Sequence, residues 1–367
     1  MRNGTIFSPA FGNRPSYLVG RQEIIREFLE GLNKKPGNRD RAIMLLGQRG
    51  SGKTVLLWEL ADRAREHGFI VANPTVVTED MLDRIIEKIQ DDGERYLSEK
   101  ETHLTGGNIG VLGFSVGLQF TKEVQESKSF QYKLSHLCRK LNNKNRGILI
   151  LVDEVQGNSP EIRQLVAAYQ ELIGEQANIA LVMAGLPAAI SATLNDHVLT
   201  FLNRARKITL GPLPEKEIDA FFAKAFNELG VQISPEERAI LTKATFGSPY
   251  MLQLVGYNVC LYANDDGSID GSLIQSALQA SKNDFENDVC KTTLAALSDQ
   301  DIAFLEAMVL NEGISKMADI SKRMNVTPDY AQKYRKRLID AGVIEAPRRG
   351  YVSFAVPYLA DYLRQER

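Results

Sequence analysis

The eight residues from Gly47 to Thr54 constrain the fold of this 367-residue chain more than any other segment. They follow Ala42–Leu46, an apolar stretch typical of a buried parallel strand, and lead into Lys53–Glu66, where the apolar spacing predicts a helix. A strand, a glycine-rich loop that ends in Lys-Thr, and a helix together predict a phosphate-binding loop. The expected phosphate-binding residues are Gly47, Gln48, Arg49, Gly50, Ser51, Gly52, Lys53, Thr54 and Val55.

Each residue type in this run has a physical role. Glycines let successive backbone N–H groups approach phosphate oxygens without a clash from a Cβ atom, and the helix N-terminus adds its dipole. Lys53 would place a cation between the β- and γ-phosphates, and the hydroxyl of Thr54 would bind Mg²⁺.

An acidic pair completes the predicted site. Asp153 and Glu154 directly follow Ile148–Val152, the most apolar strand-like run of the chain. We expect Asp153 to help Thr54 hold Mg²⁺, and Glu154 to polarise the attacking water as a general base. The sequence therefore predicts a site for ATP or ADP with Mg²⁺, in which Lys53 and Glu154 are catalytic.

The fold class follows from the alternation of strand-like and helical segments over residues 1–211. Further strands are expected at Phe69–Ala72, Ile179–Ala184 and Lys207–Leu210. Amphipathic helices are expected at Glu79–Tyr96, Phe130–Leu141 and Ile162–Ile173. This pattern predicts an α/β domain, a P-loop parallel sheet sandwiched by helices. Residues 106–120 interrupt it, and their alternation with five glycines indicates either a β-hairpin insertion or a flexible loop.

Two further domains are predicted after residue 211. Residues 212–292 carry only helical periodicity, over Glu215–Leu229, Pro235–Lys243 and Tyr250–Tyr262, and predict a helical lid domain. Residues 293–367 read as three helices followed by two short strands, which is the order of a winged helix-turn-helix domain. In the third helix of this set, Thr327 is the expected N-cap, Pro328 the first residue and Gly342 the terminator.

Composition excludes several classes of protein. The formal net charge of −2 gives no global basic field, so a nucleic-acid partner would need a local patch. The three cysteines lack the close spacing of a zinc site. The N-terminus has no apolar signal-peptide core, and the longest apolar run is too short to span a bilayer. We therefore expect a cytoplasmic protein without a membrane partner.

A local basic patch does occur near the C-terminus. From Lys322 to Arg349 there are eight basic and three acidic residues, a local charge of +5. The side chains that we expect to face double-stranded DNA are Lys333, Lys336 and Arg337 on the third helix, and Arg348 and Arg349 at the tip of the wing. A basic face on a winged helix used for protein docking is the alternative.

With these motifs the chain resembles the P-loop ATPases of the AAA+ and STAND type, and most of all the origin-recognition (Orc/Cdc) initiators and the archaeal-type ATPases. The resemblance covers the core, the lid and the winged-helix tail. Leu18, Val19, Gly20 and Arg21 are similar to the motif that lies near the adenine in these families. Gly247, Ser248 and Pro249 resemble the motif with which STAND lids approach the nucleotide.

The resemblance also implies arginines that reach the γ-phosphate. Arg204 and Arg206 stand where such folds often carry one, in cis or from a neighbouring subunit, although a plain surface arginine fits the sequence equally well. A sensor arginine is missing from residues 244–259, and Gly185-Leu186-Pro187 replaces the usual polar sensor. Both departures favour a slow switch over a fast ring-forming motor.

The sequence thus predicts an ATP-binding, slowly hydrolysing switch ATPase that couples its nucleotide state to a DNA-binding winged helix. One alternative is a STAND-like regulatory scaffold that holds ADP or ATP and signals through a protein partner or a homo-oligomer. Another is a DNA-loading partner of a mobile element or defence system.

Overall fold

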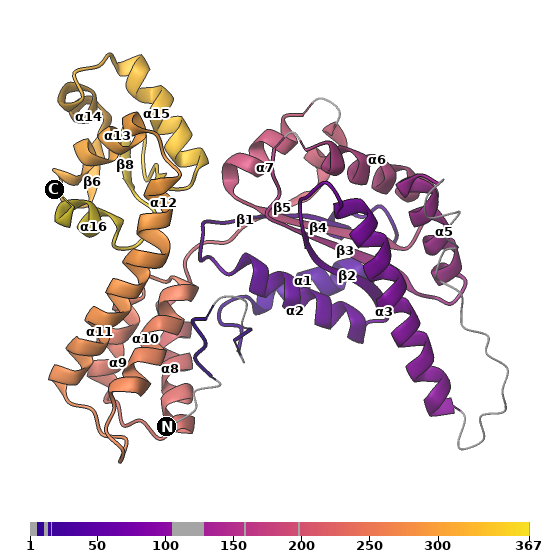
Figure 1. The fold of residues 1–367 in the computed structure, drawn as a ribbon, viewed down its shortest axis with the longest axis horizontal. Coiled ribbons are helices and arrows are strands. Elements are labelled where there is room, and N and C mark those ends of the chain that lie inside the picture. The colour runs from indigo at the N-terminus through magenta and orange to yellow at the C-terminus, as the bar shows by residue number, and fades with distance from the viewer. Residues whose placement is uncertain are drawn as a thin grey trace.

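The computed structural model describes residues 6–10, 14–15, 17–104, 128–157, 159–196 and 199–366. Figure 1 shows an α/β core beside an elongated, mainly helical body that ends at the C-terminus. The insertion that we predicted at residues 106–120 lies outside the described residues. In the described part of the chain, no helix has both the length and the apolar character needed to cross a membrane.

A five-stranded sheet forms the centre of the α/β core. Its strands are β1 (Ala42–Leu46), β2 (Phe69–Val76), β3 (Gly147–Asp153), β4 (Ile179–Gly185) and β5 (Arg206–Thr209). Their order is β2-β3-β4-β1-β5, and all neighbouring strands run parallel. The predicted α/β class with a parallel sheet is confirmed, and all the strands present their carboxyl ends at the same edge.

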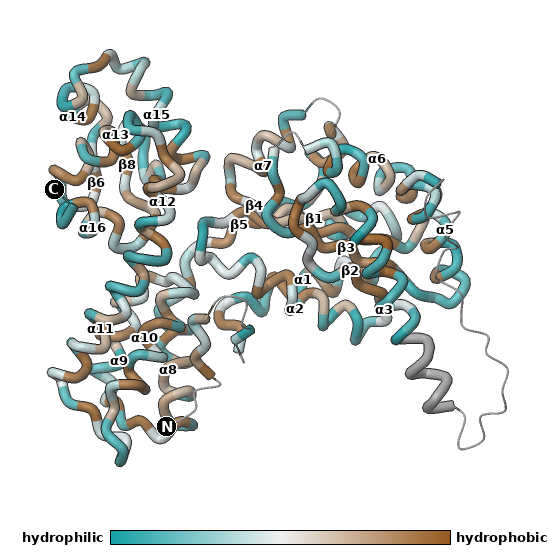
Figure 2. Tube along the Cα trace, in the orientation of Figure 1, coloured by the Kyte–Doolittle hydropathy of each residue, from teal (hydrophilic) through white to brown (hydrophobic). Residues whose placement is uncertain are grey.

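Helices cover both faces of this sheet. The core helices are α1 (Gln22–Leu32), η1 (Arg39–Arg41), α2 (Lys53–Glu66), α3 (Met81–Leu104), α5 (Phe130–Asn142), α6 (Pro160–Gly174), α7 (Pro187–Leu194) and η2 (Thr200–Arg204). Ile43 and Leu45 of β1 pack into the apolar cluster of α1 and α2, while Ala42 and Met44 pack into the cluster of α3, α5 and α6. This alternation is the period of two that a strand imposes, and the apolar strands lie between the two helical layers (Figure 2).

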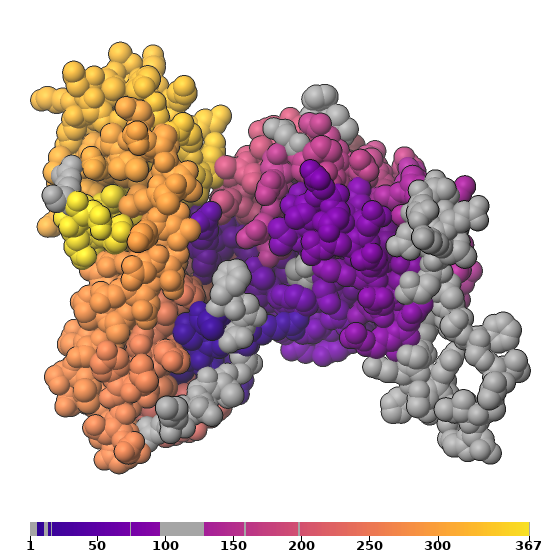
Figure 3. Space-filling view, in the orientation of Figure 1, coloured from indigo at the N-terminus to yellow at the C-terminus, as the bar shows by residue number. Residues whose placement is uncertain are grey.

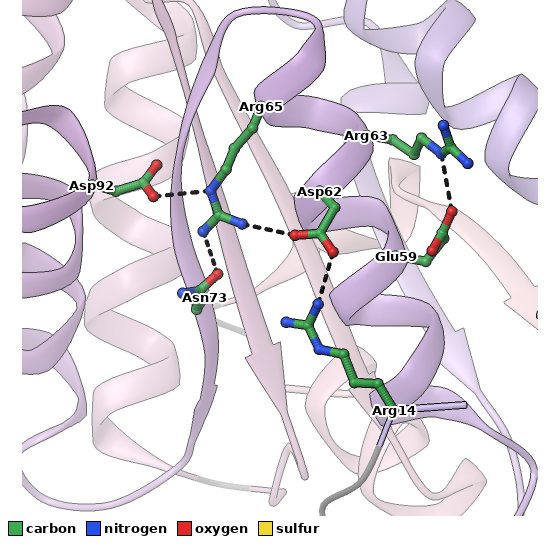
Figure 4. Close-up of polar contacts among 7 residues, drawn as sticks. All are labelled: Arg14, Glu59, Asp62, Arg63, Arg65, Asn73 and Asp92. Carbon is green, nitrogen blue, oxygen red and sulfur yellow. Dashed lines mark hydrogen bonds and ion pairs between the residues drawn. The ribbon is translucent and has the colours of Figure 1, made fainter. Parts of the chain in front are cut away.

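A polar network fixes α2 against its neighbours (Figure 4). Arg65 contacts Asp92 of α3 (Nε–Oδ1, 2.9 Å) and Asp62 of its own helix (Nη1–Oδ1, 3.1 Å). The other carboxylate oxygen of Asp92 accepts from the backbone N–H of Val71 in β2 (2.8 Å). Arg14 reaches Asp62 from the N-terminal segment (2.7 Å). These contacts hold α2 in a fixed position relative to the sheet.

The second body begins with a layer of four helices, α8 (Glu215–Leu229), α9 (Pro235–Ala244), α10 (Pro249–Tyr262) and α11 (Gly271–Phe285). We call this layer the helical layer. The N-terminal segment around Phe7 and Ser8 packs against it. The ring of Phe7 lies 5.6 Å from that of Phe221 and 5.5 Å from that of Phe226. The backbone N–H of Ser8 donates to the Gln253 side chain (2.8 Å). The sequence had not predicted this role for the N-terminus.

The chain then continues through a π-helical turn, η3 (Glu286–Cys290), and α12 (Lys291–Ala295) into the part that we call the C-terminal unit. Its elements are α13 (Asp299–Val309), β6 (Ile314–Lys316), α14 (Met317–Arg323), α15 (Pro328–Asp340), β7 (Ile344–Glu345), β8 (Tyr351–Phe354) and α16 (Leu359–Gln365). The three strands form an antiparallel sheet of order β6-β8-β7. One apolar cluster runs from the helical layer into this unit without a break, so the two pack as one body.

Candidate functional site

The glycine-rich loop lies at the carboxyl edge of the sheet, where β1 ends and α2 begins. Gly50 and Gly52 have φ values of +74° and +83°, in the left-handed region that glycine adopts without a steric penalty. Gly52 is also the N-cap of α2, and its carbonyl accepts the first helical bond, from Leu56 N (3.0 Å). The loop therefore directs free N–H groups and the positive end of the helix dipole to one place.

Gly47 and Ser51 of the loop pack so closely that there is no space for a side chain at position 47. A Cβ atom on Gly47 would overlap the Ser51 side chain. The Ser51 hydroxyl is itself buried and has no hydrogen-bond partner among the described residues. A buried polar atom without a partner is costly unless a ligand or water satisfies it, so this loop fits an anion.

Lys53 is held inside the loop. Its Nζ donates to the carbonyls of Gly47 (2.9 Å) and Gln48 (2.7 Å). Burial lowers the pKa of this ammonium group, while the nearby Asp153 and Glu154 carboxylates act to raise it. The position suits a mobile cation, and the contact of Lys53 with the β- and γ-phosphates stays a prediction.

The structure brings the loop and the acidic pair together. The Thr54 hydroxyl donates to Asp153 Oδ2 over 2.6 Å, although the two residues are 99 positions apart. Asp153 is buried at the end of β3, and its other oxygen accepts from the backbone N–H of Glu154 (2.9 Å). A hydroxyl beside a carboxylate is a pair of hard oxygen ligands of the kind that Mg²⁺ prefers, so these residues fit that ion.

Glu154 has an unusual backbone conformation. Its φ of +52° lies in the left-handed region, which is rare for a residue with a long side chain. The next residue, Val155, anchors the turn by donating its N–H to Ala184 O of β4 (2.9 Å). The turn leaves the Glu154 side chain exposed at the carboxyl edge of the sheet, beside the loop. Strained backbone of this kind is often found at functional sites.

The helical layer contacts the loop through the start of α10. A Cβ atom on Gly52 would lie 3.7 Å from Pro249, and one on Gly50 would lie 3.4 Å from Cβ of Tyr250. The residue before this helix, Ser248, is its N-cap and accepts from Met251 N (3.3 Å). Pro249 is thus next to the loop, where the sequence predicted it.

The segment expected near the adenine lies at the junction of the two bodies. Arg21 donates from Nη2 to Gly211 O (2.6 Å), at the point where the core gives way to the helical layer. Burial lowers the pKa of Arg21, and Glu217 of α8 acts to raise it. Val19 packs against the apolar cluster of the second body, and Gly20 has a φ of +69°. Residues 19–21 therefore bridge the core and the helical layer.

The two candidate arginines of the core lie at the opposite edge of the sheet. Arg206 pairs with Glu27 and with Asp40 (Nη1–Oδ1, 3.5 Å). It stands in register with Ile43 of β1, four residues before Gly47, so about 13 Å of strand separates it from the loop. Arg204 is exposed just before β5. The structure does not bring Arg204 to the loop of its own chain.

The predicted DNA-facing residues fall into two groups. Lys333 and Lys336 of α15, and Arg348 and Arg349 in the turn between β7 and β8, are exposed. The guanidinium of Arg348 stacks on the Tyr351 ring, 3.9 Å from its centroid. Arg337 is also exposed, but its guanidinium is engaged within the C-terminal unit, because it pairs with the buried carboxylate of Asp301 (Nε–Oδ1, 2.8 Å).

One neighbour of the loop was missed in the sequence. Gly342, which follows α15, lies directly against the Gln48 side chain. Its sequence signal, a glycine after a helix, predicted only the end of α15.

Comparisons with known proteins match two family models to this chain. A family model described as an ATPase domain predominantly from Archaea matches residues 18–255. A second, described as a domain of unknown function (DUF8462), matches residues 287–363. No curated protein matches the chain.

Several solved structures share the fold. The Walker-type ATPase PABY2304 of Pyrococcus abyssi has a TM-score of 0.67 at 16% identity, over 96% of this chain and 97% of its own. The ORC2 protein of Aeropyrum pernix, solved as ADPNP–ADP complexes, has a TM-score of 0.65 at 18% identity, over 97% and 95%. Cdc6p of Pyrobaculum aerophilum has a TM-score of 0.51 at 16% identity, over 98% and 97%. At these identities the similarity is one of fold.

Proposed function

The chain belongs to the family of ATPase domains found predominantly in Archaea, and from this premise we propose that it is a magnesium-dependent switch ATPase. In this proposal it binds ATP, hydrolyses it slowly and couples its nucleotide state to a DNA-binding winged helix. The observation that carries the proposal is the 2.6 Å contact between Thr54 and Asp153, which joins the glycine-rich loop to the acidic pair.

Nucleotide binding would use groups that already converge. Backbone N–H groups from Gly47 to Val55 surround the phosphates, and Lys53 turns from its loop carbonyls to the β- and γ-phosphate oxygens. Val19, Gly20, Arg21 and Pro249 line the junction where the base would lie. Thr54 and Asp153 would hold Mg²⁺, which when bound neutralises charge on the triphosphate.

Hydrolysis would require only one further group. The Glu154 carboxylate takes a proton from water, the water oxygen bonds to the γ-phosphorus, and the bond from that phosphorus to the bridging oxygen breaks. The products are ADP and inorganic phosphate. Lys53 stabilises the charge that moves onto the leaving oxygen.

Slow turnover is expected because two groups of faster relatives are missing. Gly185-Leu186-Pro187 offers no polar side chain beside the loop, and residues 244–259 contain no arginine. Arg204 lies at the far edge of the sheet, so it could assist only at the site of a neighbouring copy. In that case a homo-oligomer would hydrolyse ATP faster than a monomer.

The DNA-binding part of the proposal rests on the C-terminal unit. We interpret its order of helix, strand, two helices and two strands as a winged helix. Lys333 and Lys336 would face the major groove, and Arg348 and Arg349 would meet phosphates. The ion pair of Arg337 with Asp301 favours a structural role for that residue.

A scaffold that retains ADP is the second candidate. The two missing groups favour it, and so does the continuous packing of the helical layer with the C-terminal unit, which suits signalling through protein contacts.

The test compares Glu154→Gln with Lys53→Ala. Glu154→Gln should keep ATP affinity, since the ligands of the phosphates and of Mg²⁺ remain, while turnover falls about 10²-fold or more. Lys53→Ala should lose both affinity and turnover. Calorimetry with a non-hydrolysable analogue and a phosphate-release assay measure the two quantities.

Glu30→Gln is the matched control, because Glu30 is an exposed glutamate of α1 away from the loop. It should behave as wild type. Equal turnover in Glu154→Gln and wild type would contradict the assignment of the base. Binding without turnover in the wild type would favour the scaffold.

A further inference from the structure

The C-terminal unit touches the nucleotide loop of its own chain. Helix α15 lies beside α7 of the core, and Gly342, directly after α15, faces Gln48 in the loop. Figure 1 shows α15 next to α7, and in Figure 3 the yellow atoms of the C-terminal unit abut the surface of the α/β core. We call this contact the α7–α15 seam.

Gly342 permits this contact for two reasons. It has a φ of +73° and ends α15 with a paired set of backbone bonds, from Gly342 N to Ile339 O and from Val343 N to Leu338 O (both 2.9 Å). A Cβ atom at this position would overlap the Gln48 carboxamide. The backbone of the C-terminal unit therefore packs against a loop side chain with no space between them.

Gln48 is tied to the phosphate site at its other end. Its carbonyl accepts from Lys53 Nζ (2.7 Å) and from the backbone N–H of Ser51 (3.3 Å). A Lys53 side chain that turns to a triphosphate withdraws its proton donor from this carbonyl. Loss of this hydrogen bond frees the peptide unit that carries Gln48 to shift, and a shift there would disturb the close contact at Gly342.

The seam also affects what α15 can bind. An α-helix with its side chains is about 10–12 Å across, and the major groove of DNA is about 12 Å wide. A recognition helix enters the groove with other helices of its domain packed on it, as α13 and α14 pack on α15 here, so what matters is the bulk beside its exposed face. The α/β core adjoins α15 through α7, and in this arrangement a duplex on Lys333 and Lys336 would meet that core.

We propose that the α7–α15 seam is a DNA-excluding, docked state of the C-terminal unit, and that ATP binding releases it through Gln48 and Gly342. The inference rests on the proposed function for its nucleotide and DNA ligands, and it adds the device that couples them. Because both ligands favour the undocked state, each must raise the affinity for the other.

The test uses Gly342→Asn in the full chain. Asparagine tolerates left-handed backbone, so α15 still ends correctly, while the new side chain displaces Gln48. The matched control is Gly313→Asn, because Gly313 has a φ of +76° and open space around the Cβ position. Gln48→Ala removes the same contact from the core side. It is the variant to use if Gly342→Asn does not fold.

Hydrogen–deuterium exchange of residues 187–194 reports on the seam, since α7 loses its cover when α15 leaves. In the wild type, a non-hydrolysable ATP analogue with Mg²⁺ should raise exchange there. Gly342→Asn and Gln48→Ala should raise it without the analogue and should bind duplex DNA about fivefold or more tightly than the wild type does without nucleotide. Gly313→Asn should match the wild type.

The outcomes separate this inference from the proposed function. If calorimetry shows analogue binding but α7 exchange is unchanged, the release mechanism is wrong and the ATP site stands. If the analogue does not bind, the proposed function fails and the release mechanism with it. Unchanged α7 exchange in both variants overturns the docked state, and higher exchange without tighter duplex binding overturns the exclusion of DNA.

Discussion

Lys336 and Arg337 are consecutive residues of α15 in very different surroundings. Both side chains are exposed, but Arg337 also pairs with Asp301 and stacks on Tyr334, with its guanidinium 5.1 Å from the ring centroid. The sequence predicted both as DNA-facing because both lie on the polar side of the helix. The partner of Arg337 is 36 residues away, so no local pattern could reveal it.

The role of Arg337 can be measured through stability. Burial raises the pKa of Asp301, but hydrogen bonds from Arg337 and Ser298 outweigh it and hold that pKa below its usual range. The pair therefore stabilises the fold above about pH 4, the pKa of an unfolded aspartate, and this stabilisation is lost as pH falls through the lowered pKa. Arg337→Ala should lower the free energy of unfolding by about 1–2 kcal/mol at pH 7.

Urea unfolding at pH 7 and pH 3 checks this. The difference between Arg337→Ala and wild type should be smaller at pH 3, which lies below the pKa of an unfolded aspartate. Lys336→Ala, the matched control, should be as stable as wild type at both values. If Arg337→Ala is as stable as wild type but binds duplex DNA more weakly, Arg337 contacts DNA and the structural role is wrong.

Thr54 and Asp153 show what the sequence could predict at the level of residues. Each belongs to a motif that lies at the carboxyl edge of a parallel sheet, so the sequence alone predicts that the two side chains lie close together. The position of Arg204 could not be predicted in the same way. Which edge of the sheet it lies at depends on where β5 begins relative to β1.

At the level of elements, segments with clear end signals were predicted well. Helix α2 and helix α8 have the predicted bounds, Lys53–Glu66 and Glu215–Leu229. Helix α11 was missed because its buried face includes a polar residue. The Ser281 hydroxyl donates to Ala277 O (2.7 Å) and accepts from Asn258 of α10 (3.1 Å), so its burial depends on a tertiary partner.

Helix α7 was missed for another reason. It has eight residues and mostly small side chains, which give no strong periodicity. Its place is fixed by packing, with Ile190 inside the cluster of the sheet. The α7–α15 seam was therefore not predictable from local sequence.

The turn between β7 and β8 carries two of the exposed arginines in the proposed DNA-binding surface. Replacing Arg348 and Arg349 together by alanine should weaken binding to all duplex sequences alike, since wing arginines mostly contact the backbone. The slope of log K against log salt should lose about two units, at roughly 0.9 per phosphate contact. Fluorescence anisotropy across a salt series measures this slope.

Lys316→Ala is a useful comparison, because Lys316 is an exposed lysine on β6, outside the predicted contact set. It should leave the slope close to wild type. A double arginine variant with an unchanged slope would show that the turn does not touch DNA.

At the level of the whole molecule, the helical layer and the C-terminal unit pack against each other. We predicted a boundary between residues 292 and 293, but one apolar cluster crosses it. Tyr358 strengthens the connection by donating to Ala244 O of the helical layer (2.6 Å), and burial raises its pKa to about 12. Long-range packing of this kind leaves no compositional signal at a linker.

Within the described parts of the chain, the two bodies meet beside the nucleotide loop at residues 19–21, at the start of α10 and at the α7–α15 seam. Movement between the bodies would therefore change the surroundings of the phosphates directly. A nucleotide can shift such an equilibrium only if it interacts differently with the two arrangements, and contacts beside the phosphate loop are where such a difference would arise.

The most direct test of this coupling is the affinity for ATP with and without bound duplex DNA. Calorimetry on the Glu154→Gln protein, which should bind ATP without turning it over, measures both values with Mg²⁺ present. We predict that saturating duplex raises the affinity for ATP by about fivefold or more. An equal or weaker affinity, with anisotropy showing that the duplex is bound, would contradict the coupling of the ATP site to the C-terminal unit.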